Sequence, residues 1–286
     1  MRGSYLTPFE AVLMHEIKRR LDDLPDTFSD YANPANTFKL PFPSVNRVPP
    51  RFLVSENRTF AYDGRERLED LWNLWEKVKD PAFPYSSRIY VYGSMGYGKS
   101  HILAAFACLL MKKNERVLYL PNCSDMVAQP LSYLKKAFLF AFPEDAAFIA
   151  GCNDYNKLLT ILGQKEGICV IVDQLNALDL EEDPNDPISN EKKKDLSPFL
   201  DTMGADNIYI TSASANHKSA LHVISKSNDH KLSLIGGMTT VSILPCNYFS
   251  HLFEVSDYRW RCHNGGVVTT KISKNLMNTQ SSVSKT

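Results

Sequence analysis

Residues 88–111, RIYVYGSMGYGKSHILAAFACLLM, decide the fold of this sequence. The run at 88–92 is β-branched and aromatic, as in a strand, and the run at 100–113 is rich in Ala and Leu, as in a helix. Between them, residues 93–100 match the pattern GxxxxGK[ST] at every fixed position. The order of strand, glycine-rich loop and helix predicts a phosphate-binding loop rather than an accidental turn.

The chemistry of this loop predicts which residues contact a nucleotide. Consecutive backbone N–H groups surround a phosphate, and glycines allow backbone conformations that a side chain would forbid. The start of the following helix adds partial positive charge, Lys99 is expected to reach the β- and γ-phosphates, and Ser100 is expected to bind Mg²⁺. The predicted cofactors are therefore ATP and Mg²⁺. The expected nucleotide-binding residues are Gly93, Ser94, Met95, Gly96, Tyr97, Gly98, Lys99 and Ser100.

A second motif, ICVIVDQLNALD at 168–179, supplies a candidate metal ligand. Its continuous apolar run is typical of a strand buried on both faces of a parallel sheet. Asp173 ends this run, where a carboxylate is costly unless it is paired or close to a cation. In P-loop proteins this position completes the magnesium site, so we expect Asp173 and Ser100 to be the metal ligands. The alternative is a carboxylate that caps a nearby helix.

The residue after Asp173 bears on hydrolysis. Many P-loop ATPases have a glutamate there, whereas this sequence has Gln174, which can orient a water molecule but cannot accept a proton. We therefore expect hydrolysis to be slow or to depend on another group. Asp179, Glu181 and Glu182 could supply a carboxylate, or could belong to a solvated loop. The expected catalytic residues are Lys99, Asp173 and Gln174.

Other polar side chains follow the last predicted strand. Ser212, Ser214 and Asn216 are candidates to face the γ-phosphate. Arg259 and Arg261 are candidates for arginine fingers, with an ordinary surface position as the alternative.

The rest of the chain predicts the architecture around the loop. Strand patterns at 116–120, 165–173 and 207–211 alternate with helical patterns, including one at 125–142. This alternation indicates an α/β fold with a mostly parallel sheet flanked by helices.

The N-terminal part has a different composition. Helical periodicity is visible at 9–24 and 65–78, and five prolines at 30–50 predict an extended connector between them. The charged segment at 180–195 predicts a surface loop. The expected division is a helical and proline-rich N-terminal extension at 1–60, a P-loop domain at 61–245, and a divergent or partly disordered tail at 246–286.

Composition excludes several classes of protein. The 286 residues contain 32 basic and 32 acidic side chains, so no overall positive field indicates nucleic acid or an anionic membrane. No apolar run is long enough to span a bilayer, and the first residues lack a signal peptide, so we expect a soluble, intracellular protein. The six cysteines have no metal-binding spacing and predict buried free thiols.

Several segments resemble the P-loop NTPase region shared by Crinkler effectors and the retrotransposon hot spot proteins of trypanosomes. They are the glycine-rich loop with its flanks, RVLYLPNC, ICVIVDQLNALD, YITSASANH, IGGMTT and the upstream FAYDGRERLEDLWNLW. The resemblance covers roughly residues 50–240, and VDQLNALD followed by GGMTT is more discriminating than the loop alone.

This resemblance implies an ATPase module of the additional-strand class, which includes AAA and STAND proteins. In that class, residues 93–100 are the Walker A loop, Asp173 is the Walker B aspartate, and the polar run after Ile210 is the sensor region. Gln174 is normal for the family. Family members are commonly delivered into a host cell and act in its nucleus, which implies secretion and a host protein or DNA as partner.

The chain also departs from the family pattern. It has no LxLFLAK-type header, which argues against secretion by the Crinkler route. After GGMTT the chain continues as VSILPCNYFSHLFEV, which is not the acidic, tryptophan-containing sequence expected for the family, and no nuclease centre follows. A truncated product, or a gene model that reads through an intron at about residue 240, is one hypothesis.

The expected function is a Mg²⁺-dependent ATPase that acts as a nucleotide-driven switch in a Crinkler-like effector. The alternatives are an ATP-binding scaffold without turnover and the NTPase part of a DNA-acting protein whose nuclease domain is missing. An oligomer is compatible with all three. A small-substrate kinase is disfavoured because 180–195 is not a basic lid, and FAYDGRERL (60–68) is a candidate for contacts to the base.

Overall fold

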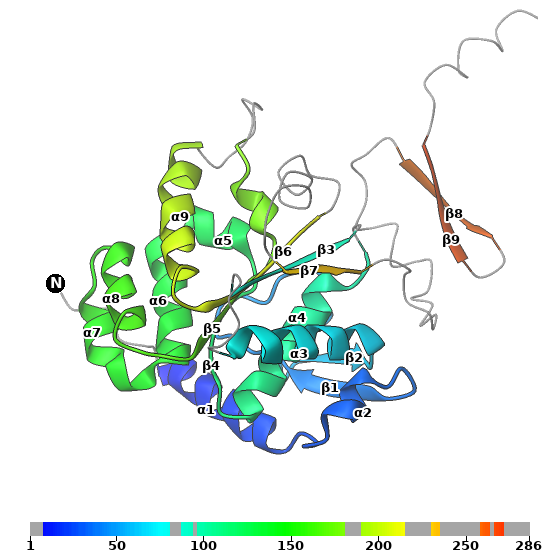
Figure 1. Cartoon of the computed structure of the whole chain (residues 1–286), viewed down its shortest axis with the longest axis horizontal. Helices are drawn as coiled ribbons and strands as arrows, with labels where there is room; N and C mark the ends of the chain where they lie inside the picture. The colour runs from blue at the N-terminus through cyan, green and yellow to red at the C-terminus, as the bar shows by residue number, and fades with distance from the viewer. Residues whose placement is uncertain are drawn as a thin grey trace, which may run out of the picture. The chain divides into compact units, whose positions relative to one another are not determined.

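The computed structural model describes residues 8–80, 87–93, 96–180, 190–214, 230–234, 258–263 and 266–271 (Figure 1). The chain divides into two units, Met1–Gly237 and Met238–Thr286. The second unit contains an antiparallel pair, β8 (Tyr258–His263) and β9 (Gly266–Lys271).

A five-stranded sheet forms the centre of the first unit. Its order is β4-β5-β6-β3-β7, and each neighbouring pair in it is parallel. One strand, β6, therefore separates the strand before the glycine-rich loop, β3, from β5, which ends at the predicted metal ligand. The predicted α/β fold class, with a mostly parallel sheet flanked by helices, is confirmed, and a strand between β3 and β5 is consistent with the predicted additional-strand arrangement. The strands are β3 (Arg88–Gly93), β4 (Arg116–Leu120), β5 (Ile168–Val172), β6 (Ile208–Ser214) and β7 (His230–Ser233).

Helices cover both faces of this sheet (Figure 1). Alternate side chains of β4 show the two faces: Val117 and Tyr119 belong to one apolar core, and Leu118 and Leu120 belong to the other. The first core contains residues of α1 (Pro8–Asp22), α2 (Phe28–Ala32), α3 (Glu66–Lys79) and α4 (Lys99–Lys112). The second contains residues of α5 (Cys123–Ala128), α6 (Pro130–Ala141), α7 (Ala146–Gly151), η2 (Tyr155–Leu158), α8 (Leu159–Leu162) and α9 (Asn190–Met203). Two short 3₁₀ helices, η1 (Pro143–Asp145) and η3 (Leu175–Leu178), complete the series.

The structure corrects two predicted elements and adds one strand that was not predicted. The helix predicted at 125–142 is two helices, α5 and α6, because Pro130 starts a new helix after Gln129. The loop predicted at 180–195 is wrong from residue 190 onward, where α9 begins and buries Lys193, whose ammonium donates to the Asp179 carbonyl oxygen at 3.2 Å. Strand β7 was not predicted, because Leu232 is its one buried apolar side chain.

The N-terminal part packs onto the same core. The helices predicted at 9–24 and 65–78 are confirmed as α1 and α3. The segment predicted as a connector is wrong in part, because β1 (Thr37–Pro41) pairs antiparallel with β2 (Thr59–Asp63). This pair is separate from the central sheet.

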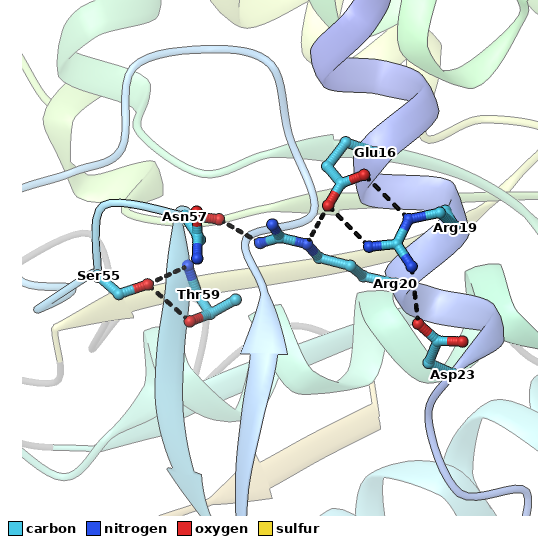
Figure 2. Close-up of polar contacts among 7 residues, drawn as sticks. All are labelled: Glu16, Arg19, Arg20, Asp23, Ser55, Asn57 and Thr59. Carbon is cyan, nitrogen blue, oxygen red and sulfur yellow. Dashed lines mark hydrogen bonds and ion pairs between the residues drawn. The ribbon is translucent and has the colours of Figure 1, made fainter.

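Arg20 links α1 to the turn before β2 (Figure 2). Its Nη1 donates to the Asn57 carbonyl oxygen at 2.5 Å, and its Nε donates to Glu16 at 2.6 Å. Arg19 also donates to Glu16, and the two guanidinium groups hold the pKa of this carboxyl at about 2, below its usual 4.5. The helix and the turn are thereby joined through one side chain.

The described residues bear on two expectations from composition, the absence of a membrane-spanning helix and the burial of free thiols. Within those ranges, no helix has both the length and the apolar character needed to cross a membrane. The prediction of buried free thiols is confirmed for Cys108, Cys123, Cys152 and Cys169, whereas Cys246 and the side chain of Cys262 lie outside the description.

Candidate nucleotide-binding site

The sheet brings the predicted site residues to one edge. In the register, Gly93 of β3 lies opposite Ser214 of β6, and Val172 of β5 lies opposite Thr211 of β6. Because the strands are parallel, the glycine-rich loop, Ser212 and Asp173 all lie at their carboxyl ends. Open α/β sheets bind ligands at this edge.

The backbone of the loop requires its glycines. Gly93, Gly96 and Gly98 have φ of 153°, 88° and 75°, values that favour glycine. A Cβ at Gly93 would also lie 2.7 Å from the carbonyl oxygen of Leu234, whereas a Cβ at Gly96 would meet no atom within 4 Å. The loop is thus tightly held at its first glycine and open at its second. Ser94 and Met95 lie outside the described residues.

Lys99 and Ser100 open helix α4. The Lys99 ammonium donates to the Gly93 carbonyl oxygen at 2.7 Å, across the loop. Burial lowers the pKa of Lys99, and the charge of Asp173 opposes this shift. Ser100 is half-buried, and the first turn of α4 contains no acidic residue. The start of this helix is therefore suited to an anion.

Asp173 is buried and firmly held. Its side chain is 1% exposed, and its N–H donates to the Leu120 carbonyl oxygen at 2.9 Å. Its Oδ1 accepts from the Ser212 hydroxyl, and its Oδ2 accepts from Arg51 Nη2 at 2.8 Å. A serine and an arginine thus satisfy the two carboxylate oxygens.

Gln174 adopts an unusual conformation beside this carboxylate. Its φ of 63° and ψ of 44° are left-handed, which costs a residue with a side chain about 1–2 kcal/mol. Its N–H donates to the Ser212 hydroxyl oxygen at 3.4 Å. Ser212 therefore connects the backbone of Gln174 to the carboxylate of Asp173.

The site contains two arginines that were not named individually as candidates from the sequence. Arg51 donates from Nη2 both to Asp173 and to the Pro121 carbonyl oxygen. Arg65 Nη1 donates to the Tyr97 carbonyl oxygen at 3.3 Å, and burial lowers its pKa. A Cβ at Gly98 would lie 1.8 Å from this Nη1, so the glycine gives the guanidinium its place on the loop. Arg65 belongs to FAYDGRERL, the segment suggested for base contacts, whereas no sequence signal marked Arg51.

His101, which lies near both arginines, is a neutral member of the site. Its ring lies 4.7 Å from that of Phe52 and 5.9 Å from that of Phe60. Burial, together with the positive charges of the nearby Arg65 and Arg51, lowers the pKa of His101 to about 4. The imidazole is thus neutral at neutral pH. Three cations, Lys99, Arg51 and Arg65, lie close to the carboxylates of Asp173 and Asp63, and this excess of positive charge suits a polyphosphate.

The remaining candidates lie elsewhere or outside the description. Asp179 lines a cavity of about 240 Å³ together with Arg88 and Tyr209. Glu181, Glu182 and Asn216 are not described, nor are the side chains of Ser214, Arg259 and Arg261.

The donor set fits a magnesium ion that is shared with a nucleotide. Over the described ranges, no group of three or more His, Cys, Asp or Glu side chains could hold a metal by itself. Mg²⁺ is commonly bound through one or two carboxylates together with phosphates and water. The Asp173 carboxylate and the Ser100 hydroxyl, at the sheet edge that carries the glycine-rich loop, are compatible with that requirement.

One comparison with known proteins agrees with this fold. A 128-residue stretch, 44% of this chain, is 27% identical to the chromosomal replication initiator protein DnaA of Aquifex aeolicus (strain VF5). The match spans 26% of the length of that protein. No family model matches the chain, so the resemblance to Crinkler and hot spot proteins rests on the quoted motifs.

Proposed function

We propose that this chain is an ATP-binding module of the AAA/STAND-like class, which binds ATP with Mg²⁺ and uses it to switch conformation. One observation carries the proposal: a glycine-rich loop with Lys99 lies at the same sheet edge as the buried carboxylate of Asp173. A nucleotide and a divalent ion together complement this mixture of charges.

Each predicted residue has a role in this proposal. The backbone of 93–98 binds the phosphates, and Lys99 stabilises charge on the transferring phosphoryl group. Ser100 and Asp173 hold Mg²⁺, which supplies charge neutralisation when bound. Gln174 orients the attacking water.

The same residues predict slow turnover. Gln174 follows the proposed metal ligand directly and cannot accept a proton from the attacking water. Slow hydrolysis suits a switch, because the nucleotide state then persists long enough to bias a two-state element. If the rate of hydrolysis falls to zero, the protein is a scaffold that binds ATP without turnover.

A DNA-acting protein is the second candidate. The similarity to DnaA, whose name describes a chromosomal replication initiator, favours it. A salt-dependent mobility shift with duplex DNA would support this candidate, because contacts to phosphates weaken steeply as salt rises. A role as a secreted Crinkler-like effector, with a host protein or DNA as partner in the host nucleus, rests on motif resemblance alone. The proposed division of the chain at residues 60 and 245 rests on composition.

Phosphate release from ATP tests turnover. We expect slow, Mg²⁺-dependent release by the wild type, loss of release in Lys99→Ala and Asp173→Asn, and unchanged release in the control Lys18→Ala, which alters an exposed lysine of α1. Tight binding without release in the wild type would favour the scaffold. Release that survives Lys99→Ala would contradict the proposed site.

A further inference from the structure

Arg51 approaches the proposed metal ligand from a distant part of the chain. It lies 122 residues before Asp173, and its Nη2 donates to Asp173 Oδ2 at 2.8 Å. The Asp173 side chain is 1% exposed, whereas 24% of the Arg51 side chain is exposed. The ion pair thus consists of a buried anion and a cation at the boundary with solvent.

Arg51 and a metal ion are alternatives at this carboxylate. Oδ1 already accepts from the Ser212 hydroxyl, and Oδ2 accepts from Arg51. A divalent cation at Oδ2 would face the positive guanidinium at close range, where like charges repel strongly. We therefore expect Arg51 to withdraw from Oδ2 when a cation binds there.

The guanidinium of Arg51 is only partly satisfied. Its Nη2 serves both Asp173 and the Pro121 carbonyl oxygen, while its buried Nε has no hydrogen-bond partner among the described residues. Arginine offers five donors in a planar fork that matches phosphate oxygens. Arg51 therefore retains donors for an anion other than Asp173.

The segment that carries Arg51 also packs on the helix that begins at the loop. Phe52, the next residue, lies 4.7 Å from the ring of His101, which follows Ser100 in α4. Arg51 is thus placed beside both the carboxylate and the start of α4, where the phosphates are expected.

We propose that Arg51 is a positioning residue that holds Asp173 and moves from this carboxylate to the phosphates when a magnesium nucleotide binds. This inference rests on the proposed function. In the exchange, the metal takes the place of Arg51 on Asp173, and the phosphate anion takes the place of Asp173 on Arg51. Each buried charge therefore keeps a partner of opposite sign.

A neutral residue at position 51 should change the magnesium dependence of nucleotide binding. Arg51→Gln removes the competing charge but keeps an amide that can donate to the Pro121 carbonyl oxygen. The Mg²⁺ concentration for half-maximal binding of an ATP analogue should fall about tenfold, which corresponds to about 1.4 kcal/mol. Binding in EDTA should be equal or weaker, because the contact of Arg51 with phosphate is lost. If Arg51 had a purely structural role, Arg51→Gln would weaken analogue binding equally in EDTA and in Mg²⁺.

The experiment is a calorimetric titration of a non-hydrolysable ATP analogue into the full chain, in EDTA and over a series of Mg²⁺ concentrations. The matched control is Arg47→Gln, which alters an exposed arginine of the same segment and should stay within about twofold of the wild type. Arg51→Lys keeps the charge but pairs at one point only, so it should shift the magnesium dependence less, in the same direction. It serves as the test if Arg51→Gln does not fold.

The outcomes separate this inference from the proposed function. A lower magnesium requirement in the Arg51 variants, with unchanged Arg47→Gln, would support the exchange. Analogue binding with equal magnesium dependence in the wild type and a folded Arg51 variant would overturn it and leave the nucleotide site standing. Absence of analogue binding in every protein would overturn both.

Discussion

The buried carboxylate of Asp173 determines which ligands this site can accept. A carboxylate that is 1% exposed is costly unless charge and hydrogen bonds compensate it, and here Arg51 and Ser212 do so. It lies at the sheet edge that also carries Lys99 and the glycine-rich loop. This sheet edge thus carries a buried carboxylate and a nearby ammonium group, two opposite charges at separate points.

The hydrogen bond from Ser212 to Asp173 should contribute measurably to stability. Ser212→Ala removes a donor to a buried ionised group, which we expect to lower the free energy of unfolding by about 1.5–3 kcal/mol. Ser233→Ala is the matched control, because the Ser233 hydroxyl is buried with no hydrogen-bond partner among the described residues. Its removal should be neutral or slightly stabilising.

Urea unfolding of the three proteins measures this difference. Equal loss of stability in the two variants would show that the hydroxyl of Ser212 contributes nothing specific to Asp173.

Local pattern predicted those elements whose residues are close in sequence. Strand β3, the loop and α4 follow one another directly, so propensity and glycine spacing were sufficient to predict them. The strand β1 was missed because prolines dominate its surroundings, although its partner β2 lies close by along the chain. The Lys99 and Asp173 positions followed from the motifs, whereas Arg51 did not, because its pairing depends on a contact across 122 residues.

The start of α3 depends on a close backbone approach at Gly64. A Cβ at this residue would lie 2.0 Å from the carbonyl oxygen of Asn33, and a backbone atom cannot move aside as a side chain can. We expect Gly64→Ala to lower the free energy of unfolding by about 2 kcal/mol or more, the cost of overpacking a tight site. Gly151→Ala, where a Cβ meets no atom within 4 Å, should stay within about 0.5 kcal/mol of the wild type.

Thermal unfolding of both glycine variants checks this expectation. If Gly64→Ala is as stable as Gly151→Ala, the approach of α2 to the start of α3 is not as close as described, and the placement of Arg65 on the loop loses its support.

The N-terminal residues and the glycine-rich loop share one apolar core in the first unit. Met14, Ile17 and Leu21 of α1 belong to the same cluster as Phe106 of α4. The segment with Arg51 joins this cluster through Phe52. Helix α1, helix α4 and the segment with Arg51 therefore pack in one continuous apolar core.

Equilibrium binding of ATP in the presence of Mg²⁺ is the measurement that tests this account most directly. Calorimetry on the purified 286-residue chain should show Mg²⁺-dependent binding that Lys99→Ala abolishes and the exposed-site control Lys18→Ala leaves unchanged. Absence of binding by a folded wild type, or equal affinity in Lys99→Ala, would contradict a nucleotide site at residues 93–100.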